Sequence, residues 1–221
     1  MPGYILHLTA AKMLLNKVGN KINENDFLFS NLLPDTVKDK ADSHFRDPKR
    51  LGKRIEYPEL RPFQRKYKDI FEDASVLGYF YHLYIDRKYF TKYIPKLVTF
   101  LDADKKVEDE TAKVVWAQIN HTGEIVPIKE FFSESYYYGD FTKMNTYLVK
   151  KYGLPMMLDI RVENPGIEEV DYGDVSKVLD ELQEYLQVPE EEARDLNVFN
   201  LEDLLAFLEN AAEEWIEDEQ K

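Results

Sequence analysis

The sequence of 221 residues contains no cysteine. Disulfide bonds and thiolate ligands are therefore excluded, and a bound metal ion would have to be held by nitrogen and oxygen atoms. The sequence also lacks any run of about 18 apolar residues, the length expected of a transmembrane helix. Its N-terminal segment shows no basic leader followed by a small-residue cleavage site, so we expect no secretory signal. Together these absences predict a cytoplasmic protein.

Basic residues are scarce in the last part of the chain. Residues 161–221 hold 20 Asp or Glu against 4 Lys or Arg, whereas the first 160 residues hold 22 against 25. An acidic chain is a poor non-specific ligand for nucleic acid or for an anionic membrane. The charge therefore argues against nucleic acid as a partner of the acidic tail, but it leaves the near-neutral first part open.

A histidine and an aspartate stand four residues apart in the segment 77–90, LGYFYHLYIDRKYF, which we predict to form one helix. His82 and Asp86 then lie on the same face, one turn apart. The rest of this face is small or apolar, and buried polar groups destabilise a fold unless they are bonded. The pair therefore indicates either a metal site or a plain hydrogen bond between the two side chains.

Two more candidates precede this helix. His7 lies on the apolar stripe of a predicted helix over residues 3–18, and Asp35 directly follows Pro34, which closes a short apolar segment. Taken alone, either residue could be an ordinary core histidine or an ordinary turn aspartate.

Residues 36–68 hold 11 Lys or Arg against 5 Asp or Glu, and we predict a long loop or a loosely helical excursion there. His44 lies in it, within the motif SHFRDP. The neighbouring cations Arg46, Lys49 and Arg50 could bind a phosphate group, because Arg and Lys are its usual partners. The alternative is a solvated basic loop.

The second half of the chain changes character. Residues 97–128 are rich in β-branched residues and predict one or two small β-hairpins. The aromatic-rich segment 130–152 includes Tyr137, which could line a substrate slot or simply pack in the core. Two amphipathic helices are expected at the end, over residues 174–187 and from Asn200 onward.

We therefore predict a mainly α protein, a helical bundle around a metal site with small hairpins near residues 97–128. Residues 1–160 would form the metal-site domain, including the hairpin insert and the aromatic-rich segment. Residues 165–221 would form an acidic helical appendage packed on it.

Three imidazoles and two carboxylates make up the candidate ligand set. Such a set suits zinc, with manganese or iron as alternatives. Five ligands are about right for two ions that share a bridging carboxylate, an arrangement that activates water in phosphoester hydrolysis. The members of the set are His7, Asp35, His44, His82 and Asp86.

The motif SHFRDP, followed by H-x-x-x-D within YFYHLYID, resembles the zinc-dependent phospholipase C family and the related single-strand-specific nucleases of plants and fungi. The resemblance covers roughly residues 1–90 and the order of all five ligands. It implies an all-helical fold in which Asp86 bridges two zinc ions and Asp35 acts as a general base.

The chain departs from that family in two places. The family holds a third zinc ion with a further histidine and an H-x-x-x-E helix, but Lys92 and Tyr93 stand where the histidine is expected, and His121 has no acid four residues later. Secreted members also bind metal through their N-terminal residue, a role that the Pro2 amine could take if Met1 were removed. We therefore expect two ions, and a small phosphate ester rather than a phospholipid.

These observations favour a metal-dependent phosphoester hydrolase. One alternative is an HD-type phosphohydrolase, although the adjacent His-Asp dipeptide of that class does not occur here. The other is a non-catalytic scaffold in which the metal is structural and the C-terminal helices bind a partner protein.

Overall fold

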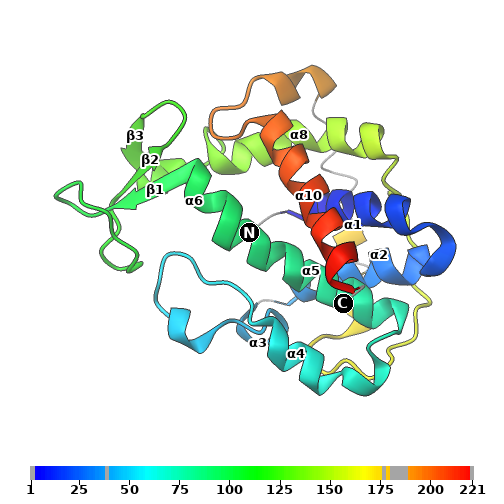
Figure 1. Ribbon diagram of the computed structural model, residues 1–221. Helices are drawn as coiled ribbons and strands as arrows, with labels where there is room; N and C mark the ends of the chain where they lie inside the picture. The colour runs from blue at the N-terminus through cyan, green and yellow to red at the C-terminus, as the bar shows by residue number, and fades with distance from the viewer. Residues whose placement is uncertain (1–2, 38–39, 176–177, 180–188, 220–221) are drawn as a thin grey trace.

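The computed structural model describes residues 3–37, 40–175, 178–179 and 189–219. Within this part of the chain the protein is mainly α-helical and carries one small antiparallel sheet (Figure 1). The predicted fold class is thus confirmed. The helices are α1 (Tyr4–Val18), α2 (Glu24–Leu32), α3 (Lys40–Ser43), α4 (Leu60–Lys66), α5 (Ala74–Lys88), α6 (Ile94–Leu97), α7 (Ile128–Phe131), α8 (Tyr137–Tyr152) and α10 (Leu201–Glu219).

Helix α5 runs through the middle of the molecule (Figure 1). Asp73 caps its N-terminus, because the Asp73 side chain accepts a hydrogen bond from the backbone N–H of Ser75 at 2.8 Å and so satisfies a free donor of the first turn. Both faces of the helix are buried over most of its length, which explains why its sequence is apolar almost all round. It continues into a π-helical turn, Tyr89–Tyr93, before α6.

Helix α2 approaches α5 closely because Gly78 has no side chain. A Cβ atom at Gly78 would lie 2.2 Å from the backbone oxygen of Phe27. At the same crossing, the side-chain amide of Asn31 donates a hydrogen bond to the carbonyl of Gly78 at 3.0 Å. This close approach sets how far the side chains of α5 lie from the end of α2.

The sheet lies beyond α6, at the far end of the α5–α6 rod (Figure 1). It consists of β1 (Val98–Leu101), β2 (Trp116–Ile119) and β3 (Ile125–Pro127), in that order and all antiparallel. Val98 pairs with Ile119, and Trp116 pairs with Pro127. The small hairpins predicted near residues 97–128 are therefore confirmed.

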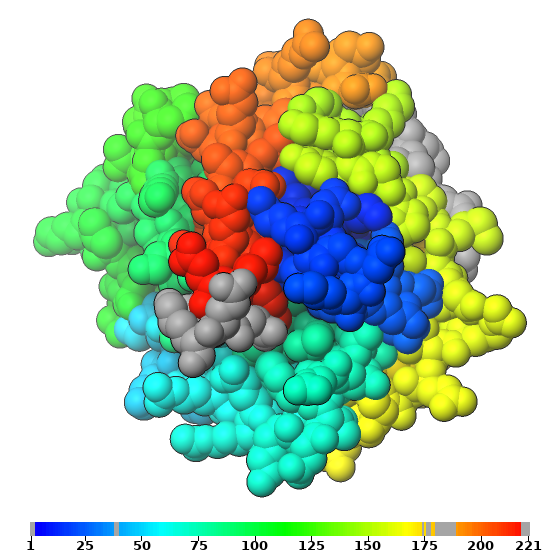
Figure 2. Space-filling view, turned by 45° about the vertical axis from the view of Figure 1, so that its right-hand side comes forward, coloured from blue at the N-terminus to red at the C-terminus, as the bar shows by residue number. Residues whose placement is uncertain are grey.

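The last helix, α10, packs across α1 and α5 (Figures 1 and 2). Four residues of its apolar stripe are buried, Leu204, Leu208, Ala212 and Trp215. The ring of Trp215 contacts those of Phe80, Tyr81 and Tyr84. The stripe is therefore part of the core and does not offer a surface to a partner protein. The other helix predicted at the end of the chain, over residues 174–187, falls largely outside the described residues.

A buried carboxylate holds the chain just before α10. Asp140 in α8 accepts hydrogen bonds from the backbone N–H groups of Asn197, Val198 and Phe199 at 3.0, 2.7 and 3.1 Å. Such bonds offset the cost of burying the charge. Asp140 thus anchors the backbone of the C-terminal segment.

Replacing Gly78 by Ala should destabilise the protein, because a Cβ atom 2.2 Å from a backbone oxygen forces α2 and α5 apart. We expect the free energy of unfolding, measured in urea, to fall by about 3 kcal/mol or more, the upper end for overpacking. Alanine's higher helix propensity would return only about 1 kcal/mol.

Gly3→Ala is the matched control, because a Cβ atom there meets nothing within 4 Å. It should cost at most about 1 kcal/mol, the loss of a glycine at a helix N-cap. Equal losses in the two variants would show that the α2–α5 crossing is not closely packed at Gly78.

Candidate metal centre

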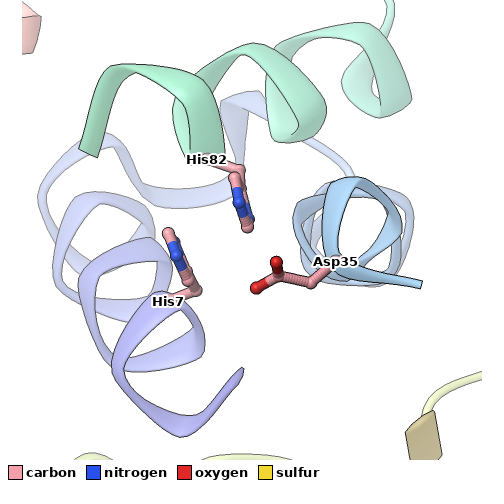
Figure 3. Close-up of side chains that lie close together, drawn as sticks. All are labelled: His7, Asp35 and His82. Carbon is pink, nitrogen blue, oxygen red and sulfur yellow. The ribbon is translucent and has the colours of Figure 1, made fainter. Parts of the chain in front are cut away.

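The five candidate ligands come from separate parts of the chain and meet in the core. His7 comes from α1, His82 and Asp86 from α5, Asp35 from the 3₁₀ turn Leu33–Asp35 after α2, and His44 from the residue after α3. None exposes more than 8% of its surface. Figure 3 shows His7, Asp35 and His82 pointing into one space from three segments.

Asn31 fixes the orientation of His82. The Nδ1 atom of His82 lies 2.8 Å from the backbone oxygen of Asn31. A carbonyl oxygen only accepts hydrogen bonds, so Nδ1 carries the proton. Neutral His82 therefore presents the lone pair of Nε2 to the cluster, the arrangement that metal-binding histidines usually show.

Ser43 fixes the orientation of His44. The hydroxyl of Ser43 donates to the backbone oxygen of Pro34 at 2.9 Å, so it accepts from Nδ1 of His44 at 3.0 Å. Nδ1 of His44 then carries a proton, and its Nε2 atom faces the cluster. Tyr79 holds this turn against α5, because its hydroxyl donates to the backbone oxygen of Ser43 at 2.6 Å.

The chain turns sharply directly after His44. Phe45 has φ of 46°, in the left-handed region that bulky residues rarely adopt. Backbone bonds hold it there, because its N–H donates to Asp42 and its carbonyl accepts from Glu59 at 2.7 Å. Strained residues of this kind persist where the surroundings fix them, often beside functional groups. Here the turn lets His44 enter the cluster while Arg46 faces a cavity.

Several buried ligand atoms of the cluster lack hydrogen bonds. The Nε2 atoms of His44 and His82 lie 3.3 Å apart, and the Oδ2 atom of Asp86 lies 3.5 and 3.9 Å from them. Among the described residues, no hydrogen-bond partner exists for either ring nitrogen of His7 or either carboxylate oxygen of Asp86. Unbonded buried groups of this kind are costly. A cation placed among them would satisfy them, so the donor set fits a metal ion.

The charges of the cluster agree with this interpretation. Burial lowers the pKa of His82 to about 3, with help from His7, so this imidazole is neutral near pH 7. Burial alone would raise the pKa values of Asp35 and Asp86. Nearby histidines, together with Lys40 in the case of Asp35, hold both below their ordinary values. Ionised carboxylates and a neutral imidazole are the forms that bind metal.

Asp86 faces two sides. Its Oδ1 atom lies 3.4 Å from Nε2 of His7, whereas its Oδ2 atom faces His44 and His82. The Oδ1 atom of Asp35 lies 3.4 Å from Nε2 of His44 and pairs with Lys40. The ligand atoms form two overlapping groups, and within each group all atoms lie within 4.8 Å of one another. One group is His7, Asp35 and His82, and the other is His44, His82 and Asp86.

A cavity of about 280 Å³ lies against the cluster. Its lining includes His44 and Asp86, three cations and an apolar wall. The cations are Arg46, Lys53 and Arg54, and the apolar wall is formed by Phe90, Ile94, Phe100, Phe132, Tyr137 and Tyr138.

Only some of the predicted phosphate-binding and substrate-binding residues line this cavity. Arg46 and Tyr137 line it, and the Tyr137 hydroxyl lies 2.8 Å from that of Tyr89. Lys49 is exposed and Arg50 pairs with Asp109 at 3.5 Å, and neither is among the lining residues.

Sequence reasoning missed four residues of the site. Lys40, Ser43 and Arg54 stood in the basic segment without any pattern that distinguished them from their neighbours, although Ser43 belongs to the SHFRDP motif. Asn31 carried no signal at all, because it acts through its backbone oxygen.

The fold and the cluster together define a mainly α-helical protein whose buried histidines and aspartates could hold a metal ion. No protein-family model matches the chain, and neither a curated protein nor a solved structure matches it. None of the described helices combines the length and apolar composition needed to span a bilayer. The function therefore has to be argued from the site itself.

We expect protein purified without chelator to contain a divalent metal, measured by elemental mass spectrometry. His82→Ala and Asp86→Ala should lose most of it, because each removes a ligand from the centre of the cluster. His121→Ala is the matched control, since His121 is exposed and lies in the turn before β3. Equal metal content in all these proteins, or no uptake of added metal by the wild type, would contradict the site.

The chelator-treated protein should lose stability as the pH falls below about 6.5. Between pH 6.5 and about 3 the unfolded chain binds a proton at His82 that the folded chain does not. The free energy of unfolding should then fall with decreasing pH, by up to about 1.4 kcal/mol per pH unit from this group. Urea unfolding at pH 7.5, 6 and 5 measures the slope, and His82→Gln should flatten it. An unchanged slope in that variant would assign the effect to other groups.

Proposed function

We propose that the protein is a metal-dependent hydrolase of small phosphate esters with a dinuclear, zinc-type centre. The observation that carries the proposal is the position of Asp86, a buried carboxylate with one oxygen toward His7 and the other toward His44 and His82. The same carboxylate lines a cavity that also presents cations. A carboxylate with ligands on both sides could bridge two ions, and paired ions stabilise the attacking and leaving oxygens in phosphoester hydrolysis.

The donor atoms could be shared between two ions. His44, His82 and the Oδ2 side of Asp86 would hold one, and His7, Asp35 and the Oδ1 side of Asp86 would contribute to the other. Zinc suits this mixture of nitrogen and oxygen ligands, and manganese and iron are alternatives. When bound, such ions lower the pKa of a coordinated water and neutralise phosphoryl oxygens. The Pro2 amine, considered as a further ligand, lies outside the described residues.

Asp35 has two proposed roles, metal ligand and general base. Its contacts with His44 and Lys40 keep it ionised, which both roles need. A general base works best when its pKa lies near the operating pH, and the pKa of Asp35 is held well below its ordinary value. This favours the ligand role, with proton transfer as a secondary one.

The cavity supports a small anionic substrate. Its volume of about 280 Å³ lies at the lower end of small-molecule sites. Arg46 supplies positive charge, although Glu56 pairs with it at 2.9 Å, and Tyr137 belongs to the apolar wall that would contact the alcohol part of the ester. These features favour a compact phosphate ester over a phospholipid with two acyl chains.

We expect the zinc- or manganese-loaded protein to hydrolyse 4-nitrophenyl phosphate or its bis-ester, measured by nitrophenolate release. His82→Ala and Asp86→Ala should each reduce kcat/KM on the order of 100-fold or more, because each disrupts the metal centre. His121→Ala should keep the wild-type rate. Full activity in His82→Ala would reject the mechanism, and no hydrolysis by metal-loaded wild type in a broad phosphoester screen would reject the proposed function.

A further inference from the structure

Arg54 differs from the other two cations that line the cavity. Arg46 is paired with Glu56 at 2.9 Å, and Lys53 is paired with Asp109 at 2.8 Å. Within the described ranges, the guanidinium of Arg54 has no ion pair and no hydrogen bond, and its Nε atom is buried without a partner. Arg54 is half-buried, and a buried N–H group of a cation is costly to leave unbonded. Its charge is thus available to a ligand.

Aromatic rings hold this guanidinium in place. Its Cζ atom lies 4.2 Å from the centroid of the Phe132 ring and 5.5 Å from that of Phe100. Stacking uses the flat face of an arginine and leaves the N–H groups of its edge free to bind an oxyanion in a forked geometry. Burial lowers the pKa of Arg54, but an arginine stays charged at neutral pH. The side chain is therefore oriented and charged before any ligand arrives.

Its backbone is fixed independently. The N–H of Arg54 donates to the carbonyl of Asp109 at 2.5 Å, and Lys53 forms a β-bridge with Glu110, so the loop between α3 and α4 is tied to the connection between β1 and β2. The position of the loop therefore does not depend on the Arg54 side chain alone. The guanidinium can bind a ligand without holding the loop in place.

Arg54 and the cluster occupy different sides of the cavity. Arg54 stacks on Phe100 of β1 and on Phe132, the residue after α7, so it belongs to the side of the sheet. The cluster comes from α1, α5, the turn after α2 and the residue after α3, and Figure 1 shows α1, α2 and α5 on the other side of α6 from the sheet. An anion held by Arg54 would therefore be distinct from a phosphate at the cluster.

We infer that Arg54 binds a second anionic group of the substrate, a carboxylate or phosphate on the alcohol part of the ester, while the phosphate to be cleaved lies at the cluster. This inference rests on the proposed function. It narrows the substrate class to compact phosphate esters that carry two oxyanion groups joined by an apolar body. The wall of Phe90, Ile94 and Tyr137 would contact that body.

Three phosphate esters with the same ring test the inference on the zinc-loaded protein: phenyl phosphate, 4-carboxyphenyl phosphate and benzene-1,4-diyl bisphosphate. Phosphate release should show that wild type prefers one or both of the doubly anionic esters by about 10- to 100-fold in kcat/KM, the range for a charged hydrogen-bond pair. The two esters distinguish a carboxylate from a phosphate as the second group. Arg54→Gln should abolish the preference, and Arg54→Lys should retain part of it.

Lys49→Gln is the matched control, because Lys49 is an exposed cation of the same loop outside the cavity. It should leave the preference unchanged. Metal content and melting temperature should be measured for every variant. If Arg54 only fastens the loop, Arg54→Gln would lower the rates on all three esters equally. That result, or no preference in the wild type, would overturn the inference while leaving the hydrolase intact.

A binding measurement separates the two proposals. Calorimetry on chelator-treated protein should show 4-hydroxybenzoate or phenylphosphonate binding at least about tenfold more weakly to Arg54→Gln than to the wild type. If no ester is hydrolysed but this loss is seen, the anion site stands and the proposed function falls. If no ester is hydrolysed and both probes bind the two proteins equally or not at all, the anion site is overturned as well.

Discussion

The burial of three histidines and two aspartates against one another is the constraint on which this structure depends. The Nε2 atoms of His44 and His82 lie 3.3 Å apart, and the Asp86 carboxylate lies beside them inside the core. Among the described residues, the ring nitrogens of His7 and the carboxylate oxygens of Asp86 are buried without a hydrogen bond, which is costly. The surrounding fold must therefore offset this cost, and a cation bound among these atoms would remove it. This is the physical argument for a metal centre rather than a set of ordinary core histidines.

The residues around the cluster hold it in a single arrangement. The backbone oxygen of Asn31 accepts a hydrogen bond from Nδ1 of His82, and the hydroxyl of Ser43 accepts one from Nδ1 of His44. The crossing of α2 and α5 at Gly78 brings Asn31 within reach of α5. The strained turn at Phe45 directs the chain so that His44 enters the cluster. Each of these contacts is local in space but joins segments far apart in the chain. The orientation of the ligands is thus a property of the helix packing as a whole.

The cavity beside the cluster has an uneven distribution of charge. Its cations lie on the loop between α3 and α4, and two of the three are matched by carboxylates. Arg54 is oriented by aromatic rings instead, on the side of the sheet. The small sheet beyond α6 therefore supplies one wall of the proposed substrate site. The C-terminal helix lies elsewhere, where it closes the core over α1 and α5 (Figure 2).

The sequence by itself determined the helical class, the position of the hairpins and the identity of the five residues that meet in the cluster. Helical periodicity and the four-residue spacing of His82 and Asp86 are local properties, and a local pattern is enough to reveal them. The tertiary structure alone decided which cations face the cavity, since Arg46, Lys49, Arg50 and Arg54 share one basic segment and differ only in how the loop closes against β1 and α7. It also decided that the stripe of α10 is core and that Asp140 anchors the backbone before it. These outcomes depend on contacts between distant segments, which no pattern within a segment encodes.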